Sequence, residues 1–274
     1  MSSGPQAHSF RAVPAVSLLT DYGLADTYVG QLKGAILSIC PTARLVDLTH
    51  VVPPQDVRTG AFLLWTATEA FPPGSIHLAI VDPGVGTSRR AVAAQSARGD
   101  VFVGPDNGLL GPALDRLGGA TCVVELTNSR FWRPAVSLTF HGRDIFGPVA
   151  GHLAKGVPLT QLGSALERLE RPFAIPLPRR TADEIEGEIL HVDGFGTLIT
   201  NIPGKLVSAA FTVDLKGQRI HGHQGAPFES VLRGLPLAIV GSQGLLEIAV
   251  REGNAAAVFG ARVGDGVTAR PPVD

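Results

Sequence analysis

The sequence predicts an α/β amino-terminal domain with a mainly parallel sheet, followed by a smaller, all-β, barrel-like domain. Three observations lead to this expectation. Short apolar runs alternate with helical patterns over about the first 170 residues, a proline-rich stretch follows, and the rest consists of short β-rich segments punctuated by glycine. Strands that helices cover on both faces are apolar throughout, and the alternation of strands with helices is typical of α/β proteins.

The expected strands of the first domain are runs rich in Val, Ile and Leu, with turn residues between them. In chain order they are VSLLT at 16–20, ARLVDL at 43–48, IHLAIVD at 76–82, AVAAQS at 91–96, DVFVG at 100–104 and TCVVEL at 121–126. Helices are expected over residues 26–40, which carry an apolar stripe, and over 56–71, which follow two prolines. Asp26 and Asp56 are the expected N-caps, because a carboxylate accepts hydrogen bonds from the free amides of a first helical turn.

The second half of the chain has a different rhythm. RPFAIPLPRR, at 171–180, carries three prolines in ten residues and indicates a linker. The segments EIEGEILHVDGF, TLITNI, FTVDLKGQRI, PLAIVGS, LLEIAVREG and GARVGDGVTA then follow, without a convincing helical stripe. We therefore expect an α/β domain at 14–170, a linker at 171–185 and a β-barrel domain at 186–274. A cleft between two domains is a common place for ligands.

Composition and charge restrict the class of protein. At 274 residues, with 23 Lys and Arg against 24 Asp and Glu, the chain can bury two cores and shows no excess charge that would favour nucleic acid or an anionic membrane. There is no apolar core of a signal peptide and no membrane-spanning apolar run. Cys40 and Cys122 lie in apolar surroundings, which favours buried free thiols in a reducing compartment. We expect a soluble, cytoplasmic protein.

The first segment with candidate chemistry is DPGVGTSRR, residues 82–90. It is neither a dinucleotide fingerprint nor a Walker loop, because the spacing differs and no GK[ST] follows. Asp82 ends a strand, where α/β folds usually place ligands, and Arg89 follows across a glycine-containing turn. Two interpretations remain open from spacing alone: a ligand site, or an Asp–Arg clasp that holds the loop.

The second segment is TFHGRDIFGP, residues 139–148. Its His141, Arg143 and Asp144 crowd between Phe140 and Phe146, which favours a partly dry polar pocket with shifted pKa values. The alternative is an ordinary turn histidine.

Further polar positions stand at strand ends and turns. Asp21 follows the first strand and could accept the two hydroxyls of a ribose, since both carboxylate oxygens only accept. Asp193 and Phe195 lie in VDGFG, which is equally a β-hairpin with a DG turn. Ser242 and Glu247 lie near a later strand.

A metal site is weakly supported, because the eight histidines are scattered and no HExxH, paired-cysteine or EF-hand spacing is present. His50 and His77 are expected in the core or at its edge. No GxSxG elbow occurs and neither cysteine has a basic helix-N-terminal setting, which argues against covalent acyl catalysis.

Taken in order, the motifs resemble one family. They are TDYG–ADTYVG, SICP, VDLTH, PQDV, VDPGVG–SRR, VGPDNGLL, FHGRDIF, VDGFG–L-TNI and GSQGLLEIAV, over about residues 16–255. This order is similar to that of the SAM hydroxide adenosyltransferases, the adenosine-forming S-adenosyl-L-methionine (SAM) hydrolases, which are relatives of the SAM-dependent fluorinase and chlorinase. The resemblance implies that SAM and water give adenosine and L-methionine, with SAM as substrate and no cofactor. It also implies a homotrimer with sites at subunit interfaces.

The resemblance implies a role for individual residues. Asp82, Arg89 and His141 correspond to a water-directing trio. Asp21 matches the ribose-binding Asp, and Phe140 is expected to exclude bulk water. The remaining implied substrate-binding residues are Asp26, Asp193 and Ser242 for the methionine ammonium and carboxylate, Phe195 for an aromatic wall, and Thr197, Glu247 and Val250.

The nature of the nucleophile follows from three positions. The halogenating relatives carry Tyr at the position of Asp82 and Thr at that of Val85, and they lack a His at that of His141; the chain is therefore expected to use water. An arginine beside a carboxylate favours its ionised form, so Asp82 is expected to orient the water more than to remove its proton. Asp82 and His141 both remain candidates for the group that accepts this proton. A halide-using, chlorinase-like SAM lyase and a non-catalytic SAM or adenosine sensor are the alternatives.

Two departures from the family affect substrate recognition. Thr197 stands where the family usually has Asn to bind adenine, and it loses the paired donor and acceptor of an amide. Gln243 stands where halogenating relatives place an Arg for the methionine carboxylate. The adenine contacts and the methionine contacts are therefore expected to differ in detail.

Overall fold

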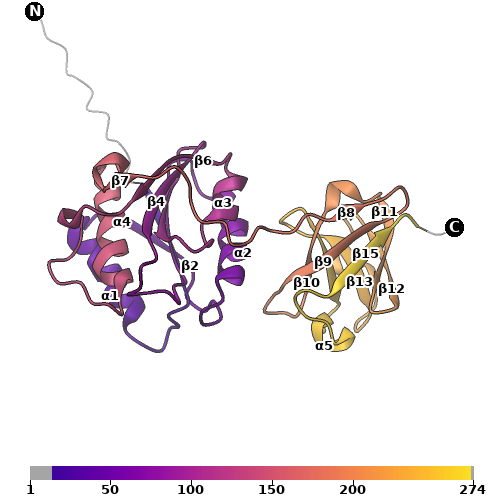
Figure 1. The fold of residues 1–274 in the computed structure, drawn as a ribbon. Helices are drawn as coiled ribbons and strands as arrows, with labels where there is room; N and C mark the ends of the chain where they lie inside the picture. The colour runs from indigo at the N-terminus through magenta and orange to yellow at the C-terminus, as the bar shows by residue number, and fades with distance from the viewer. Residues whose placement is uncertain (1–13, 273–274) are drawn as a thin grey trace, which may run out of the picture. The chain divides into compact units, whose positions relative to one another are not determined.

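The computed structural model describes residues 14–272. The chain divides into two compact units, the first ending at Ala174 and the second beginning at Ile175. Figure 1 shows helices and a sheet in the first unit and mainly strands in the second. The predicted fold class is confirmed.

The first unit contains a seven-stranded sheet in the order β2-β1-β3-β5-β4-β6-β7. Neighbours among β2, β1, β3 and β5 pair in parallel, whereas β4 is antiparallel to β5 and β6, and β7 to β6. All six expected apolar runs form strands. The bounds are β1 Ala15–Thr20, β2 Arg44–Thr49, β3 Ile76–Ile80, β4 Ala91–Ser96, β5 Val101–Pro105, β6 Ala120–Glu125 and β7 Ser164–Ala165.

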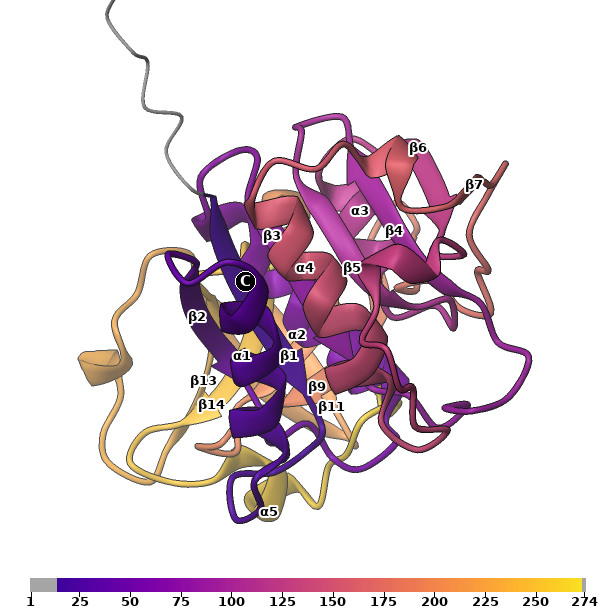
Figure 2. The same ribbon diagram turned by 90° about the vertical axis from the view of Figure 1, so that its left-hand side faces the viewer.

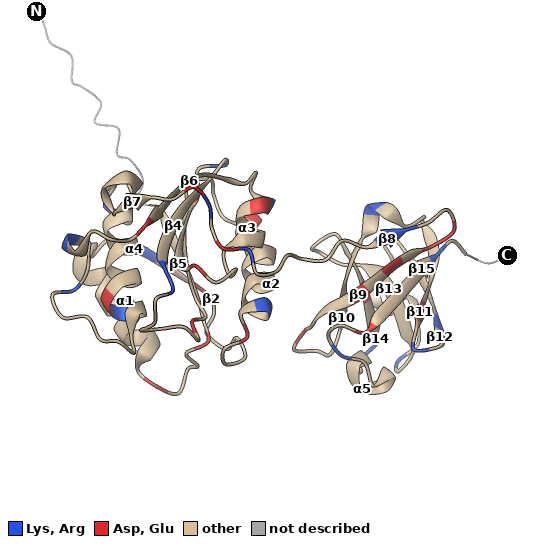
Figure 3. Ribbon diagram, in the orientation of Figure 1, with Lys and Arg blue, Asp and Glu red and all other residues tan. Residues whose placement is uncertain are grey.

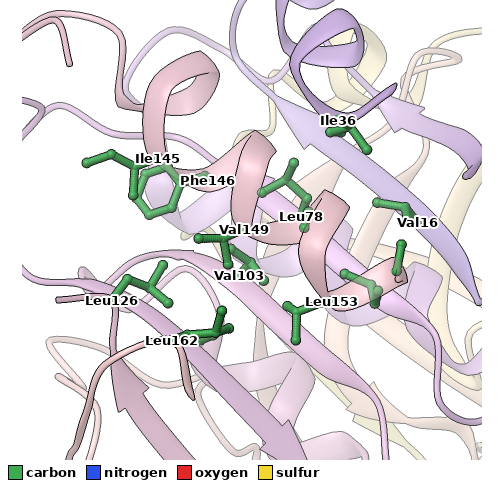
Figure 4. Close-up of a cluster of buried hydrophobic side chains, with 14 of the residues drawn as sticks. Val16, Ile36, Leu78, Val103, Leu126, Ile145, Phe146, Val149, Leu153 and Leu162 are labelled. Carbon is green, nitrogen blue, oxygen red and sulfur yellow. The ribbon is translucent and has the colours of Figure 1, made fainter. Parts of the chain in front are cut away.

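Helices cover both faces of this sheet, which is why its central strands are apolar throughout. The helices are α1 Tyr28–Ile39, α2 Val57–Ala67, α3 Gly111–Arg116 and α4 Gly147–Ala154. Figure 2 shows α1 and α4 in front of the sheet and α2 and α3 behind it. Alternate residues of each strand enter different cores: Leu18 packs with α1 and α4, and Leu19 packs with α2 and α3. The first of these cores is drawn in Figure 4.

One of the two predicted N-caps is confirmed and the other is wrong. Asp56 caps α2, since its carboxylate accepts a hydrogen bond from the Thr59 amide at 3.0 Å. Asp26 does not cap α1, because bends continue through the preceding segment and the helix begins only at Tyr28, with Thr27 in the N-cap position. Asp26 is therefore one residue too early to reach the first turn, and it is exposed.

The second unit is a closed barrel. Its sheet has the order β10-β14-β13-β12-β11-β15-β9-β8, and β10 also pairs with β9, so seven strands close on themselves and β8 lies outside the ring. Closure leaves no open edge within the ring. The bounds are β8 Arg179–Arg180, β9 Ile185–Val192, β10 Leu198–Pro203, β11 Ala210–Leu215, β12 Gln218–His223, β13 Pro236–Val240, β14 Leu245–Val250 and β15 Gly266–Arg270.

The second unit also contains one short helix that the sequence pattern did not indicate. This helix, α5, spans Ala255–Phe259, and the Asn254 side chain caps it by accepting from the Ala257 amide at 2.8 Å. Five residues are too few to show a helical stripe. The segment predicted as a linker, 171–185, contains β8 and the first residue of β9.

The histidines and cysteines predicted to be structural are largely as expected. His50 and His77 are buried. Both cysteines are free, and Cys40 is buried; Cys122 is only partly buried, because β6 is exposed at its beginning. In residues 14–272, every helix is too short or too polar to cross a membrane.

Candidate active site

The site begins at the carboxyl ends of two neighbouring parallel strands. Thr20 at the end of β1 is paired with Ile80 at the end of β3. Asp21 and Asp82 follow these residues and so leave the sheet at the same edge, which is the usual ligand-binding edge of an α/β sheet.

The loop after β3 folds Arg89 back onto Asp82. Two successive turns reverse the chain. The Val85 amide donates to the Asp82 carbonyl in the first turn, and the Thr87 amide donates to the Gly84 carbonyl in the second. Arg89 Nε donates to Asp82 Oδ1 at 2.9 Å and to Oδ2 at 3.0 Å, and Nη2 also contacts Oδ2. The two side chains are only 11% and 6% exposed. The Asp–Arg clasp is therefore present.

Gly86 brings this loop against the loop that carries His141. Gly86 has a φ of +77°, and a Cβ at this position would lie 2.3 Å from the Leu138 carbonyl oxygen. A side chain would both strain the backbone and separate the two loops. Glycine is thus required for the close approach.

His141 completes a hydrogen-bonded group of three. Its Nδ1 lies 2.9 Å from Arg89 Nη2. Because a guanidinium can only donate, Nδ1 must accept, which places the proton of the neutral ring on Nε2. Burial, and then the charge of Arg89, lower the pKa of His141 against the opposing effect of Asp82. The site therefore presents one carboxylate acceptor and one neutral N–H donor.

The other ionisable residues of the second segment anchor its loop. Asp144 is fully buried and accepts from Arg143 Nε at 2.7 Å and from the Ser137 amide at 2.9 Å. Although burial acts to raise it, these hydrogen bonds lower the pKa of Asp144. Residues Gly142–Phe146 form a π-helical turn, a rare element that often occurs at functional sites.

Aromatic rings lie beside the trio. The Phe140 side chain is 8% exposed, and its ring packs edge-on against Tyr22 at 5.6 Å and against Tyr28 at 5.2 Å between centroids. The sequence pattern had not singled out Tyr22. Its contact with Phe140 joins two segments that are far apart in the chain, so the local sequence carries no signal for it.

Asp21 is held by one oxygen. Its Oδ2 accepts from the Gln55 amide at 2.9 Å, and Gln55 adopts a φ of 66°, which non-glycine residues rarely adopt. This bond orients the carboxylate while Oδ1 keeps its accepting capacity. Asp26, in contrast, is exposed and lies within the bends that precede α1.

In the second unit, Asp193 organises the turn between β9 and β10. Its Oδ1 accepts from the Phe195 amide at 2.9 Å and the Thr197 amide at 2.8 Å. The two strands pair antiparallel, with Leu198 opposite Val192, so the hairpin interpretation is confirmed. Phe195 projects at the tip, 84% exposed, and Thr197 is buried.

Glu247 on β14 has an unusual environment. A Cβ on Gly241 would lie only 1.8 Å from Glu247 Oε1, so the carboxylate lies against the backbone just before the exposed Ser242. Burial, and then the charge of Asp193, raise the pKa of Glu247. Val250, at the end of the same strand, packs in the barrel core and is 6% exposed.

Neither charged side chains nor potential metal ligands cluster strongly in the described part of the chain. Figure 3 shows acidic and basic residues interspersed in both units. Within residues 14–272, no group of three or more His, Cys, Asp and Glu residues is arranged to hold a metal ion.

Comparisons with known proteins cover both units. A family model described as the SAM hydroxide adenosyltransferase N-terminal domain matches residues 16–163, and one described as its C-terminal domain matches 187–268. An (R)-S-adenosyl-L-methionine hydrolase of Salinispora tropica is 44% identical over 254 residues, which are 92% of this chain and 96% of the relative. One of Thermus thermophilus is 40% identical, over 91% and 96%. A fluorinase of an Actinoplanes species is 31% identical over 69% of this chain and 72% of the relative.

Solved structures show the same fold. An uncharacterized conserved protein of Thermotoga maritima is 36% identical, with a TM-score of 0.88 over 93% of this chain and 99% of that chain. A conserved hypothetical protein of Thermus thermophilus is 38% identical, with a TM-score of 0.75 over 94% and 99%.

Proposed function

The chain belongs to the SAM hydroxide adenosyltransferase family, and we infer that it hydrolyses S-adenosyl-L-methionine to adenosine and L-methionine. The resemblance drawn from the motifs is confirmed. The observation that carries the proposal is the hydrogen-bonded group of Asp82, Arg89 and His141, which places a carboxylate acceptor and an imidazole N–H donor close together at the ligand edge of the sheet.

The proposed step is an in-line (SN2) displacement at the ribose 5′ carbon. The water oxygen forms a bond to this carbon while the carbon–sulfur bond breaks, and its electron pair converts the sulfonium to the thioether of methionine. One water proton stays on the new 5′ hydroxyl, and the other leaves through Asp82 to solvent. A sulfonium needs no general acid, whereas water, with a pKa of about 15.7, is a weak nucleophile that needs help.

The geometry favours separate roles for the three side chains. Asp82 accepts an O–H of the water, and the Nε2–H of His141 donates to its oxygen. Arg89 binds Asp82 and fixes the tautomer of His141, so it positions the other two. Of the two candidate proton acceptors, Asp82 is favoured, because Nδ1 of His141 is occupied by Arg89. Alignment of this kind can supply part of the roughly 7–11 kcal/mol available from well-oriented groups.

The substrate contacts are proposed from the family match. The Oδ1 of Asp21 would accept a ribose hydroxyl, and Phe140 would exclude bulk water. Asp26, Asp193 and Ser242 would hold the methionine ammonium and carboxylate. The adenine end is assigned to Phe195 and Thr197, with Glu247 nearby; Val250 would contribute only through the barrel wall, since it faces the core. We further propose a cytoplasmic homotrimer with sites at subunit interfaces.

The test is incubation of the purified chain with SAM in ¹⁸O-labelled water. Chromatography with mass detection should find adenosine and methionine in equal amounts, with the label in adenosine. A parallel incubation in chloride separates the first alternative, because 5′-chloro-5′-deoxyadenosine would reveal a halide-using lyase. Intact SAM together with calorimetric binding would instead support a sensor and overturn the proposal.

A further inference from the structure

The Tyr22 hydroxyl occupies the space beside Gly142, which is the residue that follows His141. A Cβ on Gly142 would lie 2.2 Å from Tyr22 Oη, with Tyr22 Cζ at 3.2 Å and Ile80 Cδ1 at 3.3 Å. Real Cβ atoms do not approach an atom at 2.2 Å. The hydroxyl therefore takes the place of a side chain at position 142, and glycine is what makes room for it.

The position of the Tyr22 ring is set by its surroundings. Its amide donates to Thr20 Oγ1 at 3.3 Å, and that hydroxyl also lies 2.9 Å from Nδ1 of the buried His50. The next amide, of Gly23, donates to the His50 carbonyl at 2.7 Å. Edge-on packing against Phe140 fixes the ring plane. A ring held this way places its hydroxyl without further ordering cost.

The Tyr22 hydroxyl lies close enough to feel the charges of Asp82 and Arg89, but it makes no hydrogen bond within the described residues. Across residues 14–272, Tyr22 Oη has no hydrogen-bond partner. Burial, and then the charges of Asp21 and Asp82, raise the pKa of Tyr22 far above its usual value, while Arg89 acts in the opposite direction. The group keeps its proton at working pH, so it can accept a hydrogen bond without becoming a competing base.

A water molecule has four hydrogen-bonding positions, and the proposed mechanism fills three. One lone pair points at the 5′ carbon, the other accepts from His141 Nε2–H, and one O–H donates to Asp82. The second O–H needs an acceptor if the water is to be held in one orientation. We propose that the Tyr22 hydroxyl is this acceptor and thereby a positioning residue for the attacking water, with Gly142 required to admit it; this rests on the proposed function.

The test uses Tyr22→Phe, Gly142→Ala and the double variant, with Tyr28→Phe as matched control. Loss of one neutral hydrogen bond should lower kcat for SAM about two- to tenfold in Tyr22→Phe, with KM unchanged. Gly142→Ala should lose at least as much, because its Cβ displaces the hydroxyl. The double variant should be at most about twofold slower than Tyr22→Phe. Without the hydroxyl, the atoms nearest to the added Cβ are Tyr22 Cζ at 3.2 Å and Ile80 Cδ1 at 3.3 Å. Tyr28→Phe should keep wild-type kcat.

Three outcomes overturn the inference while leaving hydrolysis intact. The first is an active wild type with unchanged kcat in Tyr22→Phe. The second is a raised KM at constant kcat, which would assign the hydroxyl to substrate binding. The third is a double variant whose losses multiply, which would show that the two positions act independently. Thermal unfolding of each variant controls for folding. A wild type that does not hydrolyse SAM overturns the proposed function and this inference together.

Discussion

Replacing Arg89 by lysine should slow the reaction without weakening substrate binding. Arg89 donates to both oxygens of Asp82 and to Nδ1 of His141 through a planar fork. Lysine keeps the charge, but its single ammonium cannot reach both partners in the same geometry. The Arg89→Lys variant therefore isolates the orienting role from the charge.

The magnitude follows from the contacts that are lost. The bond to His141 Nδ1 has a charged donor, and such bonds contribute about 1.5–3 kcal/mol. Without it the ring can adopt the other tautomer, with Nδ1 protonated and no donor toward the water. Converted at about 1.4 kcal/mol per tenfold, kcat should fall roughly ten- to 150-fold. KM should change less than about threefold, since no role in ground-state binding is assigned to Arg89.

The assay is steady-state formation of adenosine from SAM, with ¹⁵N NMR of the histidine rings as a second measurement. Wild-type His141 should show a protonated Nε2, and the variant should show a mixture of tautomers. Arg90→Lys is the matched control, because Arg90 is adjacent in sequence but pairs with Asp106 at 2.8 Å outside the trio.

Two kinetic results would refute the reasoning. One is Arg89→Lys with kcat within about twofold of wild type, because the fork would then not matter. The other is an equal loss in Arg90→Lys, which would indicate a general effect on the loop. A wild-type His141 with its proton on Nδ1 would also contradict the hydrogen-bond direction.

The remaining predictions concern single groups of the same site. Asp82→Asn and His141→Ala should each lower kcat by about two orders of magnitude or more, with SAM binding retained in calorimetry. Burial and the charge of Arg89 lower the pKa of His141, so its ring stays neutral below pH 6.5, the usual pKa of histidine. The kcat should therefore stay level from neutral pH down to 6.5 and fall only at lower pH. A fall in kcat centred above pH 6.5 would argue against this. Gly86→Ala should lower both the melting temperature and kcat, because it adds a clash with the Leu138 carbonyl to a positive φ. Gly74→Ala, with a φ of +81° and open space, should cost only the backbone strain of about 1–2 kcal/mol.

The strands could be predicted because their apolar runs report a local and repeated constraint, burial on both sheet faces. The Asp56 cap could be predicted for the same reason, since the cap and the helix are adjacent in sequence. The prediction of Asp26 as an N-cap was wrong because α1 begins after bends whose segment is held by distant residues, through the bonds from the Gln55 amide to Asp21 and from the Gly23 amide to the His50 carbonyl. The five residues of α5 are too short to carry a period.

The site shows the same division between local and distant information. The clasp of Asp82 and Arg89 spans one loop and could be suggested from spacing. The link from Arg89 to His141 came only from the family resemblance, because it joins separate segments. The approach of Tyr22 to Gly142 had no sequence signal, since a glycine is compatible with many structures and only the fold shows what fills the space beside it.

The parallel pairing of β1 with β3 keeps the residues that form the cores apart from the residues that form the proposed site. The side chains of the strands pack in two hydrophobic cores, whereas the proposed ribose and water contacts, Asp21 and Asp82, lie one and two positions beyond the strand ends, in loops. Substitutions confined to those loops therefore change the groups at the proposed site without altering the side chains of the two cores. Descent from a common ancestor would then preserve the scaffold across different chemistries, in keeping with a fluorinase that still shares 31% of aligned residues with this chain.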